Sequence, residues 1–301
     1  TQKKRNHKHA YLAVFDNQKW VPICYGTQKG KVCYFNEIGK DIAYLPLYYD
    51  NQGIHPITDP FILDSRGRIK YLHADTSKRK KVILSRKYYL AKHIFDYAKT
   101  LTGGHFEASN NPDFSDPDTI HTISHWLLSA DSFEIKPQKT YRYWRYVSAK
   151  NKGCNLAELA FYSDKEEKEL TGTIIGTNAS VRYDTMPMDK SKVFDKDILT
   201  YYEAPSTVDY PWVGLDFNKP VSINKIIYTP RNDDNNIHAG DLYELFYWEY
   251  NHWMSLGQQR AIESKLTYTN VPDNALLLLK DLTKGEEERI FTYENDKQVW
   301  W

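Results

Sequence analysis

Short strand-like runs separated by turn residues fill this chain, and they constrain its fold more than any other feature. Residues 10–73 contain six such runs, with Gly, Asn or Asp at most joints: AYLAVF, KWVPICY, KVCYF, IAYLPLYY, FILD and RIKYL. Eight more follow residue 165: GTIIGT, WVGLDF, INKIIY, LYELFYW, HWMSLG, KLTYTNV, NALLLLKD and RIFTYE. Strands at this spacing predict an all-β protein built of β-sandwiches.

Three segments between these runs need separate interpretations. LAKHIFDYAKTL (residues 90–101) is the one plausible helix, because its apolar residues recur on one helical face. The basic stretch KRKKVILSRKYYL (78–90) is interpreted as a strand with one solvated face. The charged run SDKEEKEL (163–170) is interpreted as a solvated turn.

The runs predict tandem domains. We expect an N-terminal β-sandwich domain over residues 1–101, a short β unit over 102–164, and a third domain over 165–301. The third range contains eight strand-like runs, which is the strand count of a jelly-roll sandwich. The terminal pair Trp300 and Trp301 is expected to pack against that sandwich, because two large rings in water would form an exposed apolar patch.

The charge and composition narrow the functional classes. Lys and Arg total 40 and Asp and Glu total 39, which gives a net charge of +1 and no electrostatic reason to expect binding to nucleic acid or to an anionic membrane. The sequence contains no run of 18 apolar residues, so no membrane span is predicted. The 24 Tyr and 8 Trp residues favour β-structure and are common in saccharide-binding surfaces.

The chain opens with TQKKRNHKHAYL, which has neither an initiator Met nor an apolar signal segment. We interpret it as a piece or processed product of a longer protein. The three cysteines are Cys24, Cys33 and Cys154. Cys24 and Cys33 could pair across a hairpin, but three buried, unpaired thiols are the favoured interpretation.

Signatures of catalysis are missing from the sequence. It contains no G-x-S-x-G, H-E-x-x-H or C-x-x-C motif. GTQKGK (26–31) resembles a phosphate-binding loop, but it is one residue short and has Val32 where Ser or Thr must reach magnesium, so a hairpin turn is predicted instead. These observations predict a non-enzyme.

One acidic cluster could hold a cation. In VFDKDILTYYEAP, Asp195, Asp197 and Thr200 supply three side-chain oxygens within six residues. Calcium takes six to eight oxygen ligands from carboxylates, hydroxyls and backbone carbonyls. A turn capped by these same side chains is the alternative.

Several motifs in order resemble the discoidin family, also called the coagulation-factor type C or galactose-binding-like domain. They are VFDKDILTYYEAP, then WVGLDFNKPVSINKIIYTPRNDDN, then YELFYWEYNHWMSLG, and the match covers roughly residues 165–301. The earlier stretch YRYWRYVSAKNKGCNLAELAFY resembles the closing strands of the family, which marks residues 102–164 as a shortened discoidin-like unit. The arrangement is similar to the C-terminal non-catalytic half of large secreted proteins of gut Bacteroidetes, some of which carry a transglutaminase-like domain upstream.

The resemblance implies a galactose-binding-like jelly roll for residues 165–301. It also implies a structural calcium ion at Asp195, Asp197 and Thr200, helped by a carboxylate near the C-terminus, for which Glu294 is the candidate. The sequence departs from the family at Lys196, where Gly is common, and this puts a tight loop in doubt.

The resemblance places the polar stretch RNDDNN (231–236) in a loop at the ligand-binding end of the sandwich. Sugars are held by hydrogen bonds from Asp, Asn and Arg and by an aromatic platform. The predicted ligand-binding residues are Arg231, Asn232, Asp233, Asp234 and Asn235, with Tyr201 or Tyr202 as the platform. The alternative is a self-satisfied loop, in which Arg231 pairs with its own acids and the amides cap turns.

We therefore expect a non-catalytic carbohydrate-binding protein or module of the cell envelope or exterior, with a glycan or glycoconjugate as its partner. Its expected location is the periplasm, the cell surface or the medium. One alternative is a structural spacer or protein-interaction module. Another is an accessory fragment of a larger transglutaminase-like or glycan-processing enzyme whose catalytic domain precedes residue 1.

Overall fold

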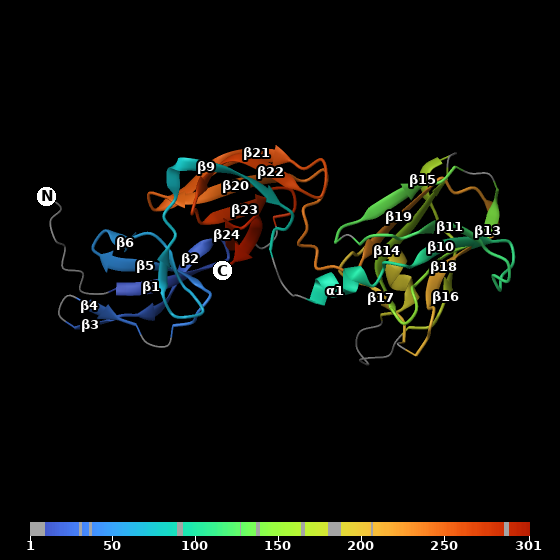
Figure 1. Ribbon diagram of the computed structural model, residues 1–301, viewed down its shortest axis with the longest axis horizontal. Coiled ribbons are helices and arrows are strands. Elements are labelled where there is room, and N and C mark those ends of the chain that lie inside the picture. The colour runs from blue at the N-terminus through green and yellow to red at the C-terminus, as the bar shows by residue number, and fades with distance from the viewer. Residues whose placement is uncertain are drawn as a thin grey trace. The chain divides into compact units, whose positions relative to one another are not determined.

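A computed structural model describes residues 10–29, 32–35, 38–88, 93–126, 128–136, 139–163, 166–179, 188–205, 207–285 and 289–301. The described chain is nearly all β, in antiparallel sheets, as predicted. It forms two compact units: unit 1 combines residues 1–89 with 237–301, and unit 2 comprises 90–236. In Figure 1, unit 1 therefore combines the blue and cyan segments with the deeper orange and red ones, while unit 2 runs from turquoise through green and yellow to light orange.

Unit 1 is built from two sheets, a two-stranded ribbon and a hairpin. The first sheet has the order β2-β1-β5-β7-β8, with β6 paired to β5, and the second has the order β21-β20-β23-β24-β25. The ribbon pairs β9 with β22, and the hairpin pairs β3 with β4. The strands are β1 (Ala10–Asp16), β2 (Lys19–Tyr25), β3 (Thr27–Lys29), β4 (Val32–Tyr34), β5 (Ala43–Asp50), β6 (Gly53–Pro56), β7 (Phe61–Leu63), β8 (Ile69–Tyr71), β9 (Asp75–Leu84), β20 (Leu242–Glu249), β21 (His252–Arg260), β22 (Leu266–Asp273), β23 (Leu277–Asp281), β24 (Ile290–Glu294) and β25 (Lys297–Trp300).

The second sheet of unit 1 buries both of its faces. Leu276 and Leu278 belong to the core shared with the first sheet, whereas Leu277 and Leu279 belong to the core shared with the β9–β22 ribbon. Alternate side chains of a strand point to opposite faces, so the run of four leucines follows from a strand that is covered on both sides. The covering layers come largely from residues before 90.

Unit 2 is a sandwich of two five-stranded sheets. One sheet has the order β11-β10-β13-β18-β16, and the other has β12-β19-β14-β15 with β17 paired to β14. One core holds residues from both sheets, among them Phe106 and Trp144 from the first and Phe161 and Ile226 from the second. The elements are α1 (His93–Lys99), β10 (His105–Ser109), β11 (Asp118–Thr122), β12 (Asp131–Glu134), β13 (Tyr141–Val147), β14 (Cys154–Ser163), β15 (Glu166–Leu170), β16 (Thr173–Gly176), the 3-10 helix η1 (Lys190–Phe194), β17 (Tyr202–Glu203), β18 (Trp212–Val221) and β19 (Lys225–Pro230).

The structure divides the chain differently from the predicted domains 1–101, 102–164 and 165–301. The predicted boundary at 164/165 would separate strands that pair, because β13 pairs with β18 and β14 with β19. The range 165–301 is split instead, since β20 to β25 pack with the N-terminal strands. The single strands were predictable from local sequence, whereas their partners are determined by long-range packing.

Predictions about single helices and strands agree more closely with the structure than the predicted domain boundaries do. The predicted helix is present as α1, and the basic segment 78–90 contributes to β9, which alternates buried Val82 and Leu84 with exposed Ile83. The charged run was wrongly interpreted as a turn, because Glu166–Leu170 forms β15 at the edge of a sheet. An edge strand leaves room for charged side chains in water.

Three further expectations concern side chains and membrane spans. Trp300 packs against Phe291 with ring centroids 4.8 Å apart, and Trp301 packs against the core between the two sheets of unit 1. Within the described part of the chain, Cys24 and Cys154 are free thiols, but only Cys154 is buried as predicted, because Cys24 is partly exposed. The side chain of Cys33 lies outside the described residues. No helix among the described residues has the length and apolar character needed to cross a membrane.

A buried ion pair generates the first prediction. Lys87 Nζ lies 3.3 Å from Asp281 Oδ2, and the two side chains are only 2% and 1% exposed. Replacing Lys87 with Met leaves a buried carboxylate without its cation, so we expect the free energy of unfolding of unit 1 to fall by about 3–5 kcal/mol. Denaturant titration of the full chain measures it.

Lys78→Met is the matched control. Lys78 pairs with Asp75 at 3.3 Å, but its side chain is 74% exposed, so water already screens the pair. We expect this change to cost less than about 1 kcal/mol. Equal losses in the two variants would contradict the assigned role of the buried pair.

Candidate functional site

The loop that contains the RNDDNN sequence follows β19 at one end of the unit 2 sandwich. β19 pairs with the first residues of β14, where Pro230 lies opposite Leu156. The backbone N–H of Arg231 then donates to the carbonyl of Asn155 at 2.9 Å, which continues the ladder by one more bond. β17 flanks β14 at the same end, with Tyr202 opposite Leu156.

Arg231 is held between two aromatic rings. The carbon of its guanidinium group lies 3.7 Å from the ring centroid of Tyr97 and 3.6 Å from that of Tyr201. Its Nη1 donates to Glu203 Oε2 at 3.3 Å and to Asn155 Oδ1 at 3.4 Å. The Arg231 and Glu203 side chains are only 16% and 10% exposed. Stacking, charge pairing and burial together fix the plane of the guanidinium group.

The amides of the loop are occupied by the backbone. Asn232 Nδ2 donates to the carbonyl of Pro230 at 2.8 Å, and Asn235 Nδ2 donates to that of Asp233 at 2.9 Å. The Asn232 Oδ1 atom accepts from the N–H of Asp234 at 2.8 Å. Both amide residues are buried, so their side chains stabilise the loop. This differs from the prediction, in which they bind a ligand.

The two tyrosines predicted as the aromatic platform differ in burial. Tyr202 is fully buried in the sandwich core and donates to the carbonyl of Thr177 at 2.7 Å, and its burial raises the pKa of the phenol. It has no exposed area to offer a sugar. Tyr201 is only partly buried and covers Arg231. From the predicted set, the side chains with exposed area are Arg231, Asp233, Asp234 and Tyr201.

The predicted cation residues Asp195, Asp197 and Thr200 come together in a compact turn. Thr200 Oγ1 lies 3.1 and 3.0 Å from the two carboxylate oxygens of Asp195 and 3.0 Å from the carbonyl of Asp197. Asp195 Oδ1 also accepts from the N–H of Asp197 at 3.0 Å. The side chains of Asp195, Asp197 and Thr200 therefore lie in one turn. The hydrogen bonds among them are also those expected of a capped turn, the alternative interpretation.

Lys196 adopts the backbone conformation that a glycine would take. Its φ of 68° lies in the left-handed region, which is uncommon for a residue with a Cβ. Its ammonium group forms an ion pair with Glu169 on β15. The loop therefore keeps the tight geometry that the substitution of Lys for Gly had put in doubt.

Glu294 is not brought together with this turn. It lies at the end of β24 in unit 1, where it pairs with Lys70 at 2.7 Å. The carboxylate beside Asp195 is Glu158 of β14, which the sequence analysis missed. The packing of η1 on β14 brings the two acids close, and the AEL sequence around Glu158 was the available signal.

The environment of Glu158 disfavours its ionised form. Burial, followed by the negative charge of Asp195, raises its pKa from 4.5 to about 7. Its Oε1 atom is buried and has no hydrogen-bond partner among the described residues. Within the described ranges, no group of three or more His, Cys, Asp or Glu side chains is arranged to hold a metal.

Comparison of the chain with protein-family models, curated proteins and solved structures gives no match.

The raised pKa of Glu158 generates the second prediction. The folded state binds the proton of Glu158 more tightly than the unfolded chain does, so protonation of Glu158 stabilises the folded state. This contribution to the free energy of unfolding is complete below about pH 4.5 and is lost as the pH rises through about 7. Glu158→Gln mimics the protonated form at every pH. In chelator, we expect it to match the parent near pH 4.5 and to exceed its free energy of unfolding by about 1–3 kcal/mol near pH 8.

Parallel denaturant titrations of the two proteins across this pH range measure the difference. Glu134→Gln is the control, since Glu134 is an exposed residue of β12 in the same unit. A difference between parent and Glu158→Gln that does not vary with pH would contradict the prediction.

Proposed function

We propose that the protein is a non-catalytic carbohydrate-binding module of the cell envelope or exterior, and that unit 2 is its discoidin-like sandwich. One observation supports this most. The stretches 141–162, 193–205 and 212–231, which carry much of the resemblance, lie in one sandwich, in which β13 pairs with β18 and β14 pairs with β19. The predicted ligand loop follows at its end. The stretch YELFYW lies in unit 1, so the proposal rests on the stretches in unit 2.

The loop offers the chemistry that a sugar requires. The guanidinium group of Arg231 is a planar donor, and both of its described hydrogen bonds use Nη1. Asp233 and Asp234 are only partly buried and carry carboxylate acceptors for hydroxyl groups. The ring of Tyr201 adds an apolar surface beside the guanidinium group.

The same loop also supports the alternative of a structural spacer, because its amides and Arg231 are engaged within the protein. Arg231→Ala cannot separate the two functions, since it would leave Glu203 buried without its cation and lower stability in either case. Suitable variants must remove ligand contacts and keep the fold.

The third prediction uses the loop carboxylates. In the double variant Asp233→Asn, Asp234→Asn, each residue keeps a side-chain oxygen and loses its charge, and Asn tolerates the left-handed φ of 52° at position 234. We expect stability to change by less than about 1 kcal/mol and the affinity for a glycan to fall about tenfold, because charged acceptors form stronger hydrogen bonds.

A glycan array with the full chain, followed by calorimetry on the glycans that bind, measures this loss. Asp113→Asn is the matched control, because exposed Asp113 accepts from the N–H of Ser115 as Asp233 does from that of Asn235. A parent that binds no glycan would favour the spacer. Binding that the double variant retains would place the sugar elsewhere.

We further propose that the turn at Asp195 holds a calcium ion, with Glu158 in place of Glu294. The Oε1 atom of Glu158, which has no hydrogen-bond partner among the described residues, and the oxygens of Asp195 and Thr200 would supply an oxygen-rich donor set of the kind that suits this ion. A cation would neutralise the repulsion between the two carboxylates and favour the ionised form of Glu158. Its role would be structural.

The fourth prediction is a calcium-dependent melting temperature. A ligand that binds only the folded state raises the melting temperature by mass action. Near pH 8, we expect calcium to raise it for the parent relative to chelator, and to do so much less for Glu158→Gln. Equal melting curves in calcium and chelator, together with no metal in elemental analysis, would exclude the site.

A further inference from the structure

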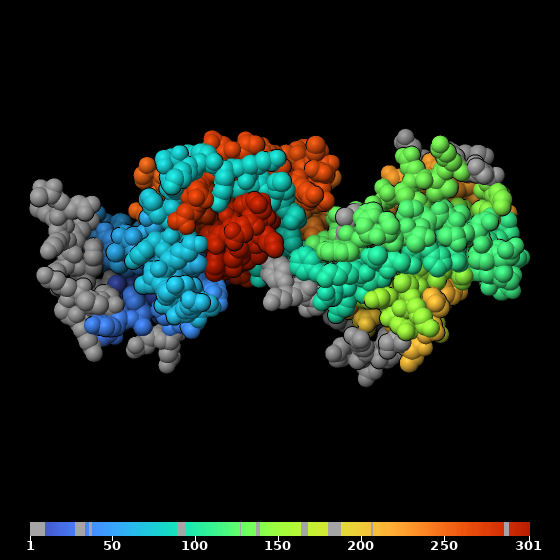
Figure 2. Space-filling model, viewed as in Figure 1, coloured from blue at the N-terminus to red at the C-terminus, as the bar shows by residue number. Residues whose placement is uncertain are grey.

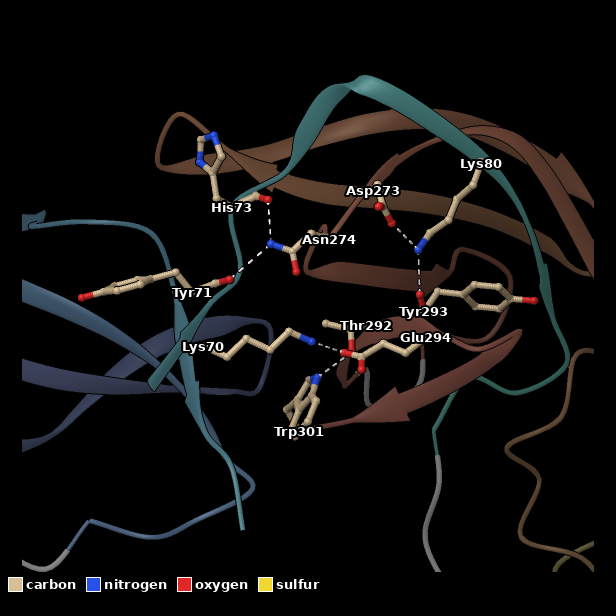
Figure 3. A network of polar contacts seen from close by, with 10 residues as sticks. All are labelled: Lys70, Tyr71, His73, Lys80, Asp273, Asn274, Thr292, Tyr293, Glu294 and Trp301. Atoms are coloured by element: carbon tan, nitrogen blue, oxygen red, sulfur yellow. Dashed lines mark hydrogen bonds and ion pairs between the residues drawn. The ribbon is translucent and has the colours of Figure 1, made fainter. Parts of the chain in front are cut away.

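Unit 1 contains a polar cavity of about 290 Å³ that the proposed function does not use. Lys70, Lys80, Asp273 and Glu294 contribute to its wall, together with Asn274 and Leu277. Both lysines come from the N-terminal segment, and both carboxylates come from the C-terminal segment. Figure 3 shows the two pairs with their neighbours, and in Figure 2 the red and cyan surfaces of these segments adjoin.

Each lysine faces its own carboxylate. Lys70 Nζ lies 2.7 Å from Glu294 Oε1, and Lys80 Nζ lies 2.7 Å from Asp273 Oδ1. Burial alone would raise the pKa of Glu294, but hydrogen bonds from Lys70 and Thr292 outweigh it and lower the pKa. The hydrogen bond from Lys80 is the main cause of the lowered pKa of Asp273. The cavity therefore presents two charged donors and two charged acceptors at neutral pH.

A larger cavity of about 680 Å³ lies next to the first, and both are lined by Asp273 and Asn274. Asn274 Nδ2 donates to the carbonyls of Tyr71 and His73 at 3.2 and 3.0 Å, which fixes the shared wall (Figure 3). Tyr250 also lines the larger cavity, and it is 76% exposed. An elongated ligand could extend from the paired charges past Asn274 to an aromatic ring.

The balance of charges points to a neutral ligand. An anion would have to compete with a carboxylate already bound to each lysine, and a cation would have to compete with each ammonium group. A hydroxyl group both donates and accepts, so neighbouring hydroxyls can contact a carboxylate and an ammonium group without separating the pair.

We propose that unit 1 carries a separate binding site for a short neutral oligosaccharide, with one sugar between the two lysine–carboxylate pairs and the chain continuing past Asn274 toward Tyr250. This inference does not depend on the loop in unit 2.

The indole N–H of Trp301 provides a local probe. It donates to Thr292 Oγ1 at 3.1 Å, and Thr292 lines the smaller cavity and hydrogen-bonds to Glu294. The full chain, with its tryptophans labelled with nitrogen-15, is titrated with cellotriose, maltotriose, mannotriose and xylotriose by NMR. Trp301→Phe assigns the signal. We expect at least one trisaccharide to shift it at millimolar concentration, the range of a weak site.

Two variants test the assigned contacts. Asp273→Asn removes a carboxylate that is 49% exposed, and Tyr250→Asn removes an exposed ring at a left-handed φ that Asn tolerates. Each is expected to weaken the trisaccharide about tenfold, roughly the loss of one charge-assisted hydrogen bond or one ring contact. Asp64→Asn is the control in unit 1, because among the described residues the Asp64 carboxylate bonds to exposed Arg68 and to the backbone of its own turn.

Three outcomes overturn the proposal. They are an unshifted Trp301 signal with every trisaccharide, equal weakening by Asp64→Asn, and a shift produced only by charged sugars such as glucosamine or glucuronic acid oligomers. The double variant Asp233→Asn, Asp234→Asn is expected to keep the shift. Its behaviour therefore distinguishes failure of this site from failure of the loop in unit 2.

Discussion

The burial of both faces of the sheet β21-β20-β23-β24-β25 is the constraint on which the rest of the structure depends. Consecutive leucines from 276 to 279 alternate between two separate cores, so this sheet needs a covering layer on each side. Segments before residue 90 supply most of that cover. The two ends of the chain must therefore fold as one unit, and residues 90–236 become an insertion. The two segments of unit 1 that flank the insertion are joined by a hydrogen bond from the N–H of Ile237 to the carbonyl of Ser85 at 3.2 Å.

Ion pairs that join the N-terminal and C-terminal parts of unit 1 differ in burial, and this difference separates their roles. Lys87 and Asp281 are almost completely buried, so water cannot compensate either charge if the other is removed. Lys70 and Lys80 pair with carboxylates on the wall of a cavity, where about a third to half of each side chain meets solvent. Such pairs contribute little to stability and keep hydrogen-bonding capacity for a ligand.

In unit 2, the polar composition of the RNDDNN loop is compatible both with a sugar-binding site and with a loop whose side chains bond to each other and to the backbone. The geometry shows which residues bond within the protein and which keep exposed area. The amides of Asn232 and Asn235 bond to the backbone, and Tyr202 lies in the core. Arg231 pairs with Glu203, an acid that lies 28 positions away in the sequence. Contacts over such separations are created by strand pairing between β14, β17 and β19.

The sequence by itself determined the all-β class, the positions of most strands, helix α1 and the compact turn at Asp195, because alternation, turn residues and short-range hydrogen bonds are local properties. Only the tertiary structure decided which strands share a sheet. It divided the predicted domain 165–301 between two units, placed Glu294 with Lys70, and brought Glu158 to Asp195. The sequence of a strand shows that one of its faces is apolar, but it does not show which other apolar surface of the chain packs against that face. The choice among them is made by the packing of the whole chain, in which segments about 200 residues apart bury each other's surfaces.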